Sequence, residues 1–159
     1  MSYRVFSQRS EPRLPFADLL NQARRFFEAR LEVEGESGFA PGQAPLATHA
    51  TLRIASARLG FDERVRVHAR PRSAMDLADA QRAEVRGRAA GMATLAARCP
   101  TVWELAEDGP TEVVLLCTSG LLASVALGPV LPPDGSTLFG VRGAMERVDL
   151  LSGGRTLLR

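Results

Sequence analysis

The longest stretch with a helical pattern of apolar and polar positions runs from Ser73 to Arg98. Ser73 with Asp76 three residues later is an acidic variant of the capping box that begins helices. Steps of about 100° per residue place large apolar side chains on one surface and small residues on another. The large side chains are Leu77, Val85, Met92, Leu95 and Cys99, and the small-residue stripe includes Ala83, Gly87, Gly91 and Thr94.

The two glycines of this stripe indicate a close contact, because each interior glycine costs a helix about 0.5–1 kcal/mol relative to alanine. The contact partner is either the first helix of the same chain or a second copy of the chain in a homodimer. The sequence predicts that first helix from Pro15 to Glu34, before Gly35. Phe16, Leu19, Phe27 and Leu31 fall on its apolar side, which we expect to cover a core.

Ala50–Leu59 and Arg64–Arg70 alternate between apolar and polar residues and predict a hairpin. Its outward face would carry Arg53, Arg64, Arg66, His68 and Arg70. This face is either a solvated surface or a site for a ligand or anion. If Leu59 pairs with Arg64, His49 and His68 lie roughly 20 Å apart, too far to share a metal ion.

Glu112–Thr118 and Leu121–Leu127 are apolar at nearly every position, which is typical of strands covered on both faces. They predict a second hairpin, around Ser119-Gly120. Weaker signals are an edge strand at Tyr3–Phe6, a capped helical turn from Thr101 to Glu104, and strands at Leu138–Val141, Glu146–Leu151 and Thr156–Leu158.

These elements predict an α+β fold in a single domain over residues 1–159. An antiparallel sheet of five to seven strands, built from the two hairpins, would be covered by two amphipathic helices. The order helix, hairpin, helix, hairpin is similar to that of roadblock-type domains and of secretion-chaperone domains. Roadblock-type domains end in a helix, whereas the C-terminus of this chain is strand-like. Secretion chaperones are acidic, whereas this chain has a net charge of +2, so no family is assigned.

The amino-acid composition excludes several classes of catalytic site. The chain has 20 basic residues, all of them arginine, and a formal net charge of +2. The absence of lysine excludes a Schiff-base enzyme, a phosphate-loop lysine and a Ser–Lys dyad within this chain. No apolar run approaches the ~20 residues of a membrane span, and the first residues lack the core of a signal peptide. We therefore expect a cytoplasmic protein without membrane contact.

The two cysteines do not form a disulfide framework in a chain of this length. Cys99 lies near an expected helix start, which could lower its pKa and make it a reactive thiol. Packing of both cysteines in the interior is the alternative.

The leading hypothesis for function is a non-enzymatic binding or assembly module that forms a homodimer or binds a protein partner. The alternative is a small enzyme or small-ligand-binding protein using Cys99 or His68, in a pocket near the Gly- and Pro-rich segment 36–48. The sequence points to no cofactor and no metal site, and the balanced charge disfavours nucleic acid as a partner.

Overall fold

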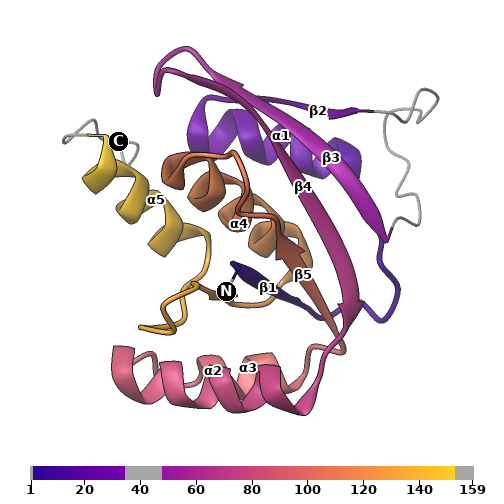
Figure 1. Ribbon diagram of the computed structural model, residues 1–159, viewed down its shortest axis with the longest axis vertical. Helices are drawn as coiled ribbons and strands as arrows, with labels where there is room; N and C mark the ends of the chain where they lie inside the picture. The colour runs from indigo at the N-terminus through magenta and orange to yellow at the C-terminus, as the bar shows by residue number, and fades with distance from the viewer. Residues whose placement is uncertain (1, 35–47, 153–159) are drawn as a thin grey trace.

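The protein is built on one antiparallel sheet in the strand order β2-β3-β4-β5-β1-β6 (Figure 1). The computed structural model describes residues 2–34 and 48–152. The strands are β1 (Arg4–Ser7), β2 (Arg30–Glu34), β3 (His49–Ser56), β4 (Phe61–Pro71), β5 (Thr101–Leu105) and β6 (Val130–Leu131). The expected α+β class, with a single antiparallel sheet of five to seven strands, is confirmed.

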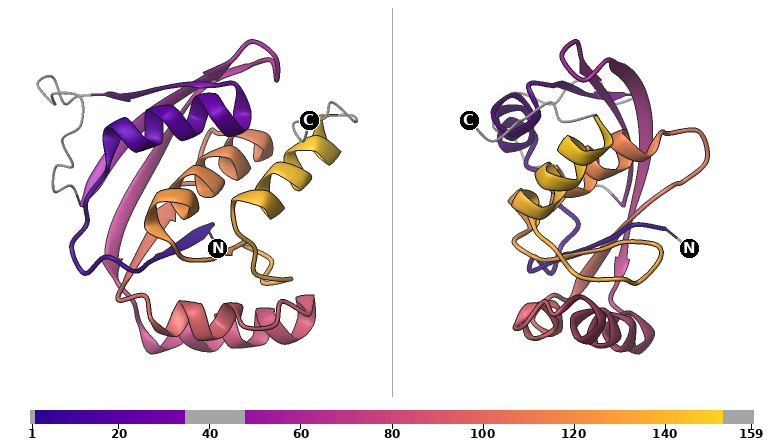
Figure 2. Two further views of the ribbon diagram at one scale, coloured as in Figure 1. Left: turned by 180° about the vertical axis from the view of Figure 1, so that it is seen from behind. Right: turned by 90° about the vertical axis from the view of Figure 1, so that its left-hand side faces the viewer.

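Five helices occur in the described ranges and cover the sheet unequally. They are α1 (Phe16–Phe27), α2 (Ala74–Gly87), α3 (Met92–Ala97), α4 (Glu112–Ala126) and α5 (Val141–Leu151). Helices α1, α4 and α5 lie on one face of the sheet, while α2 and α3 lie side by side across one end (Figure 2). Most of the other face, over β3 and β4, carries no helix.

The core is divided in two because residues alternate between the faces of a strand. Val5 of β1 and Trp103 of β5 point into the main cluster, formed with α1, α4 and α5. Phe6 and Val102, one residue along, point into a second cluster against α2 and α3. Strand β1 pairs with β5 on one side and with β6 on the other, so the predicted edge position of Tyr3–Phe6 is wrong.

Helix α1 ends at Phe27, seven residues before the predicted end at Glu34. Glu28 adopts the left-handed conformation, with φ of 50°, and its backbone N–H bonds back to the last turn. Arg30–Glu34 then pairs with β3 as an edge strand. Leu31 is buried as expected, but it belongs to a strand and not to a helix. The alternation of charged and apolar residues at 30–34 matches the two-residue period of a strand.

The hairpin of β3 and β4 is present with a register different from the predicted one. Ser56 pairs with Phe61, and Leu59 lies in the turn, where Gly60 has φ of 76°. A hydroxyl of Ser56 accepts a hydrogen bond from the backbone N–H of Leu59, which stabilises this turn. The shift places His49 directly opposite His68.

The predicted helix Ser73–Arg98 is two helices. The capping box between Ser73 and Asp76 is present at the start of α2. Arg88 and Gly91 both have positive φ, and the chain turns there so that α3 folds back beside α2. The predicted surface of large apolar side chains is not buried as a whole, since Val85 of α2 is 79% exposed.

Residues 112–126 form helix α4, so the predicted second hairpin is wrong. Twelve of its fifteen residues are buried. A helix buried on all sides has no polar face, so its sequence has no helical period to distinguish it from buried strands. Gly120 permits the contact with α5, because a Cβ there would lie 2.7 Å from the Cβ of Ala144.

Three smaller predictions also fail or lie outside the described residues. Thr101–Leu105 is strand β5 rather than a capped helical turn. The segment predicted as a strand at 146–151 lies within helix α5. In the segment 138–141, Phe139 forms only an isolated bridge with Val130, and Val141 begins α5. Thr156–Leu158 is not among the described residues. Without a second hairpin, the similarity in element order to roadblock-type and chaperone domains no longer holds.

Candidate functional site

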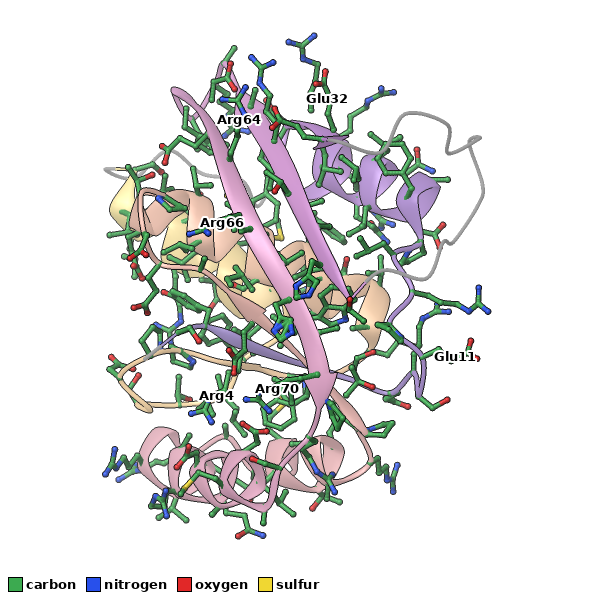
Figure 3. The ribbon with its side chains drawn as sticks, turned by 45° about the vertical axis from the view of Figure 1, so that its right-hand side comes forward. Arg4, Glu11, Glu32, Arg64, Arg66 and Arg70 are labelled. Atoms are coloured by element: carbon green, nitrogen blue, oxygen red, sulfur yellow. The ribbon has the colours of Figure 1, made fainter. Side chains whose placement is uncertain are left out.

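An open cleft of about 710 Å³ lies on the face of the sheet that the helices leave uncovered. Its floor is formed by outward side chains of β3, β4 and β5, and residues 104–108 form one side. Arg64, Arg66 and Arg70 project from outward positions of β4, with His68 at the outward position between the last two (Figure 3). The pocket predicted near segment 36–48 stays a prediction, because only Thr48 of that segment is among the described residues.

Two histidines meet in the floor of the cleft. His49 and His68 are directly paired across β3 and β4, and their rings stack with centroids 4.5 Å apart and an interplanar angle of 9°. The predicted separation of roughly 20 Å is wrong because it assumed a different turn. Glu104 of β5 is paired with His68 in turn, so the three side chains form one cross-strand row.

Most of the predicted basic face is neutralised by acidic neighbours. Arg53 makes a two-point contact with Asp62, at 2.9 and 2.7 Å. The Nε of Arg64 donates to Glu34 at 2.6 Å. Arg70 pairs with Glu104 as well as with α2. An extended site for polyanions is therefore not formed by these arginines.

Arg66 is the exception among the outward arginines of this hairpin. It is exposed, it lines the cleft opposite Thr51, and no acidic side chain of the described residues pairs with it. An arginine offers five N–H donors in a fixed planar fork that suits carboxylates and phosphates. Arg66 is thus the group in the cleft best suited to hold an acidic ligand.

Asp76, in the first turn of α2, is the centre of a cluster of charged side chains outside the cleft lining. Arg70 contacts both of its carboxylate oxygens, at 2.5 and 2.8 Å, and Arg4 contacts Oδ1 at 3.0 Å. Burial, the largest single influence, raises the pKa of this carboxyl. Hydrogen bonds from Arg70, from the Ser73 backbone and from Arg4 together outweigh burial, so the pKa lies well below its usual range. The cluster ties α2 to β1 and β4, which is a structural task.

Cys99, the predicted reactive thiol, lies in the second apolar cluster, away from the cleft. It is fully buried, and its Sγ lies 3.3 Å from the carbonyl oxygen of Leu95. Burial raises its pKa to about 11, the opposite of the lowered pKa expected of a reactive thiol. Burial also raises the pKa of Cys117, inside α4.

The four residues predicted to form a packing or dimer contact do not share one surface. Ala83 is buried inside the chain, whereas Gly91 and Thr94 are exposed beyond the break in the helix. Gly87 is exposed as a residue, but a Cβ built on it would lie 2.0 Å from the Oγ1 of Thr137. The segment before α5 therefore makes the close contact that was predicted for the first helix or for a second copy.

Within residues 2–34 and 48–152, no group of three or more His, Cys, Asp or Glu side chains is arranged to hold a metal ion. In the same ranges, no helix has both the length and the apolar character needed to cross a membrane.

Sequence reasoning missed His49 as part of the site. Its position depends on which residues of the turn are left unpaired, and the run from Ala57 to Gly60 permits several registers. The one usable signal is Gly60, because a left-handed residue closes many hairpin turns.

With this geometry in view, the chain was compared with protein-family models, with curated proteins and with solved structures. No family model, no curated protein and no solved structure matches it.

Proposed function

We propose that the protein is a non-enzymatic binding module that holds a small polar molecule with an acidic group in the cleft. The observation that carries this proposal is the stacked pair of His49 and His68 in one cleft with Arg66, which pairs with no acid of the described residues. The cleft volume of about 710 Å³ is in the usual range of about 300–1,000 Å³ for small-molecule sites. Of the two alternatives drawn from the sequence, a small enzyme or a small-ligand-binding protein that uses His68, this proposal takes the second.

The side chains of the cleft divide the recognition between them. Arg66 can bind a carboxylate or phosphate through two parallel hydrogen bonds. Each neutral imidazole of the pair has one N–H donor and one acceptor nitrogen for the polar remainder of the ligand. Four acids also line the cleft: Glu34, Glu104, Glu107 and Asp108. Glu34 and Glu104 each pair with an arginine, which weakens their repulsion of an acidic group, and Arg66 must offset the remaining negative charge.

A binding role is favoured over catalysis by how the histidines are held. A catalytic base is normally oriented by a third group, usually a carboxylate or hydroxyl. Among the described residues, neither imidazole has such a hydrogen bond, and the nearest acid in the row, Glu104, is bound to Arg70. Both cysteines lie outside the cleft.

Assembly into a homodimer is the second candidate, and one observation favours it. Helix α2 exposes two large apolar side chains on its outward side, Met75 at 67% and Val85 at 79%. Light scattering tests this directly: a mass of two chains that falls to one in Val85→Asp supports it, and a single-chain mass of the native protein rejects it.

Titration with inorganic phosphate, followed by amide NMR, tests the ligand site. We expect saturable shifts centred on β3 and β4. Arg66→Gln should weaken binding by about tenfold or more, because it removes a charge-assisted contact. Arg64→Gln is the matched control on the same strand and should change affinity by less than about twofold, since Arg64 is already paired with Glu34. Equal effects of the two variants, or shifts elsewhere, would reject the site.

A further inference from the structure

A second cavity, of about 240 Å³, lies on the other side of the molecule from the cleft. It is lined by Tyr3, by the start of α4, by α5 and by the loop 132–139 that precedes α5. Nothing in the proposed function uses it, and the inference drawn from it does not depend on that function.

Arg147 of α5 is the cationic group of this cavity. Its guanidinium carbon lies 4.5 Å from the centre of the Phe139 ring, which holds the group in a fixed orientation. Its Nε is shielded from solvent and has no hydrogen-bond partner in the part of the chain that the structure describes. A buried donor without an acceptor is costly, and such groups in native proteins usually have a function or bind something.

The two acids that line the cavity are engaged elsewhere. Glu112 accepts a hydrogen bond from the Tyr3 hydroxyl, and Asp134 accepts one from the backbone N–H of Ser136 at 3.0 Å. Among the described residues, neither acid forms an ion pair with Arg147. Within residues 2–34 and 48–152, the guanidinium therefore has no counter-ion in contact with it, although two carboxylates lie nearby.

The remaining wall of the cavity is apolar. Leu116 and Phe139 are buried in it, and Leu150 and Leu151 stand at its mouth, 81% and 55% exposed. Exposed leucines beside a cavity provide a surface for the hydrocarbon part of a ligand. The volume limits that part to a short chain.

We propose that this cavity binds a monocarboxylate with a short, branched aliphatic chain. The carboxylate pairs with Arg147, and the chain packs against Phe139, Leu150 and Leu151. A single negative charge gains a direct contact with the guanidinium, which outweighs repulsion from the more distant Glu112 and Asp134. Phosphate has no hydrocarbon part to pack against Phe139, Leu150 and Leu151, so we expect the cavity to bind it more weakly than a monocarboxylate.

Calorimetric titration of the full chain with isocaproate tests the proposal, with isocaproamide as its neutral analogue and inorganic phosphate as the dianion. We expect saturable binding of isocaproate, with the amide weaker by about tenfold or more, since it loses the charge-assisted contact. Phosphate should give no shifts in amide NMR at residues 132–139. The comparison of acid with amide uses the native protein, so it decides the question even if a variant fails to fold.

Arg147→Met keeps an unbranched side chain beside Phe139 but removes every donor, and it should abolish the preference for the acid over the amide. Arg142→Met, an exposed arginine of the same helix, is the matched control and should bind as the native protein does. In amide NMR of the native protein, isocaproate should shift residues 132–139 and α5 rather than β3 and β4, which separates this cavity from the cleft. Absence of saturable isocaproate binding, equal affinity for acid and amide, or unchanged preference in Arg147→Met would overturn the proposal.

Discussion

Arg70 and Asp76 form a two-point ion pair that ties β4 to the start of α2, with Nη1 donating to Oδ2 at 2.5 Å and Nη2 to Oδ1 at 2.8 Å. Asp76 is 1% exposed and also caps its own helix through Ser73. One residue therefore combines a local signal for a helix start with a contact between distant parts of the chain.

Asp76→Asn should lower the free energy of unfolding by about 1–3 kcal/mol, because Arg4 and Arg70 each lose one acidic partner and keep only Asp79 and Glu104. Urea unfolding measures this loss. Asp62→Asn is the control, since it breaks the exposed pair with Arg53 and should have little effect. Equal losses in the two variants would mean that burial of the Asp76 pair does not matter.

The same carboxylate should make the fold sensitive to acid. Its folded pKa lies below that of an unfolded aspartate, which is about 3.9. The unfolded chain therefore binds the proton first, so the stabilisation is present above about pH 4 and is lost as the pH falls below it. Unfolding curves across this range should fall more steeply for the native protein than for Asp76→Asn. Parallel curves would contradict the assignment.

Phe27 should be a core residue whose truncation is costly. Phe27 belongs to α1, and its side chain is fully buried in the main apolar cluster. Phe27→Ala should lower the free energy of unfolding by about 3–5 kcal/mol, because it leaves a cavity. Phe26, its half-buried neighbour, provides the control, because Phe26→Ala removes less buried surface. Urea unfolding of both variants should give a clearly larger loss for position 27.

Neither thiol should react in the folded protein. Burial raises the pKa of Cys99 to about 11 and also raises that of Cys117, so almost no thiolate is present near neutral pH. Iodoacetamide followed by mass spectrometry should add no label to the native chain and two labels after denaturation. Labelling of native Cys99 would restore the reactive-thiol hypothesis.

Sequence reasoning succeeded where a local rule decides the structure. The capping box of Ser73 and Asp76 involves residues three apart, and the start of α2 follows from it. The alternation along β3 and β4 likewise fixes which side chains point outward. Both are properties of a few neighbouring residues, which a sequence displays directly.

It failed where distant packing or a single backbone conformation decides. Glu28 and Arg88 leave their helices through the left-handed conformation, although neither is glycine. Helix α4 owes its buried position to neighbours on every side, so its sequence carries no polar face as a signal. The meeting of His49 with His68 depends on a turn register that differs by a few residues from the predicted one.

Gly87 gives a sharp test of close packing at the exposed end of α2. An added Cβ would lie 2.0 Å from the Oγ1, 2.2 Å from the Cβ and 2.7 Å from the Cα of Thr137. Since the last of these is a backbone atom, rotation of the threonine side chain cannot relieve the clash. We expect Gly87→Ala to lose about 1–3 kcal/mol by overpacking, despite the gain of up to about 1 kcal/mol in helix propensity.

The partner of Gly87 can be identified by a double-mutant cycle. Thr137→Gly removes two of the three clashing atoms. It should therefore raise the free energy of unfolding of the Gly87→Ala variant, whereas in the native background, where there is no clash, it should give no such gain. Because the contact lies within one chain, Gly87→Ala should leave the mass in sedimentation unchanged. A fall in mass without rescue by Thr137→Gly would instead place a second copy of the chain against Gly87.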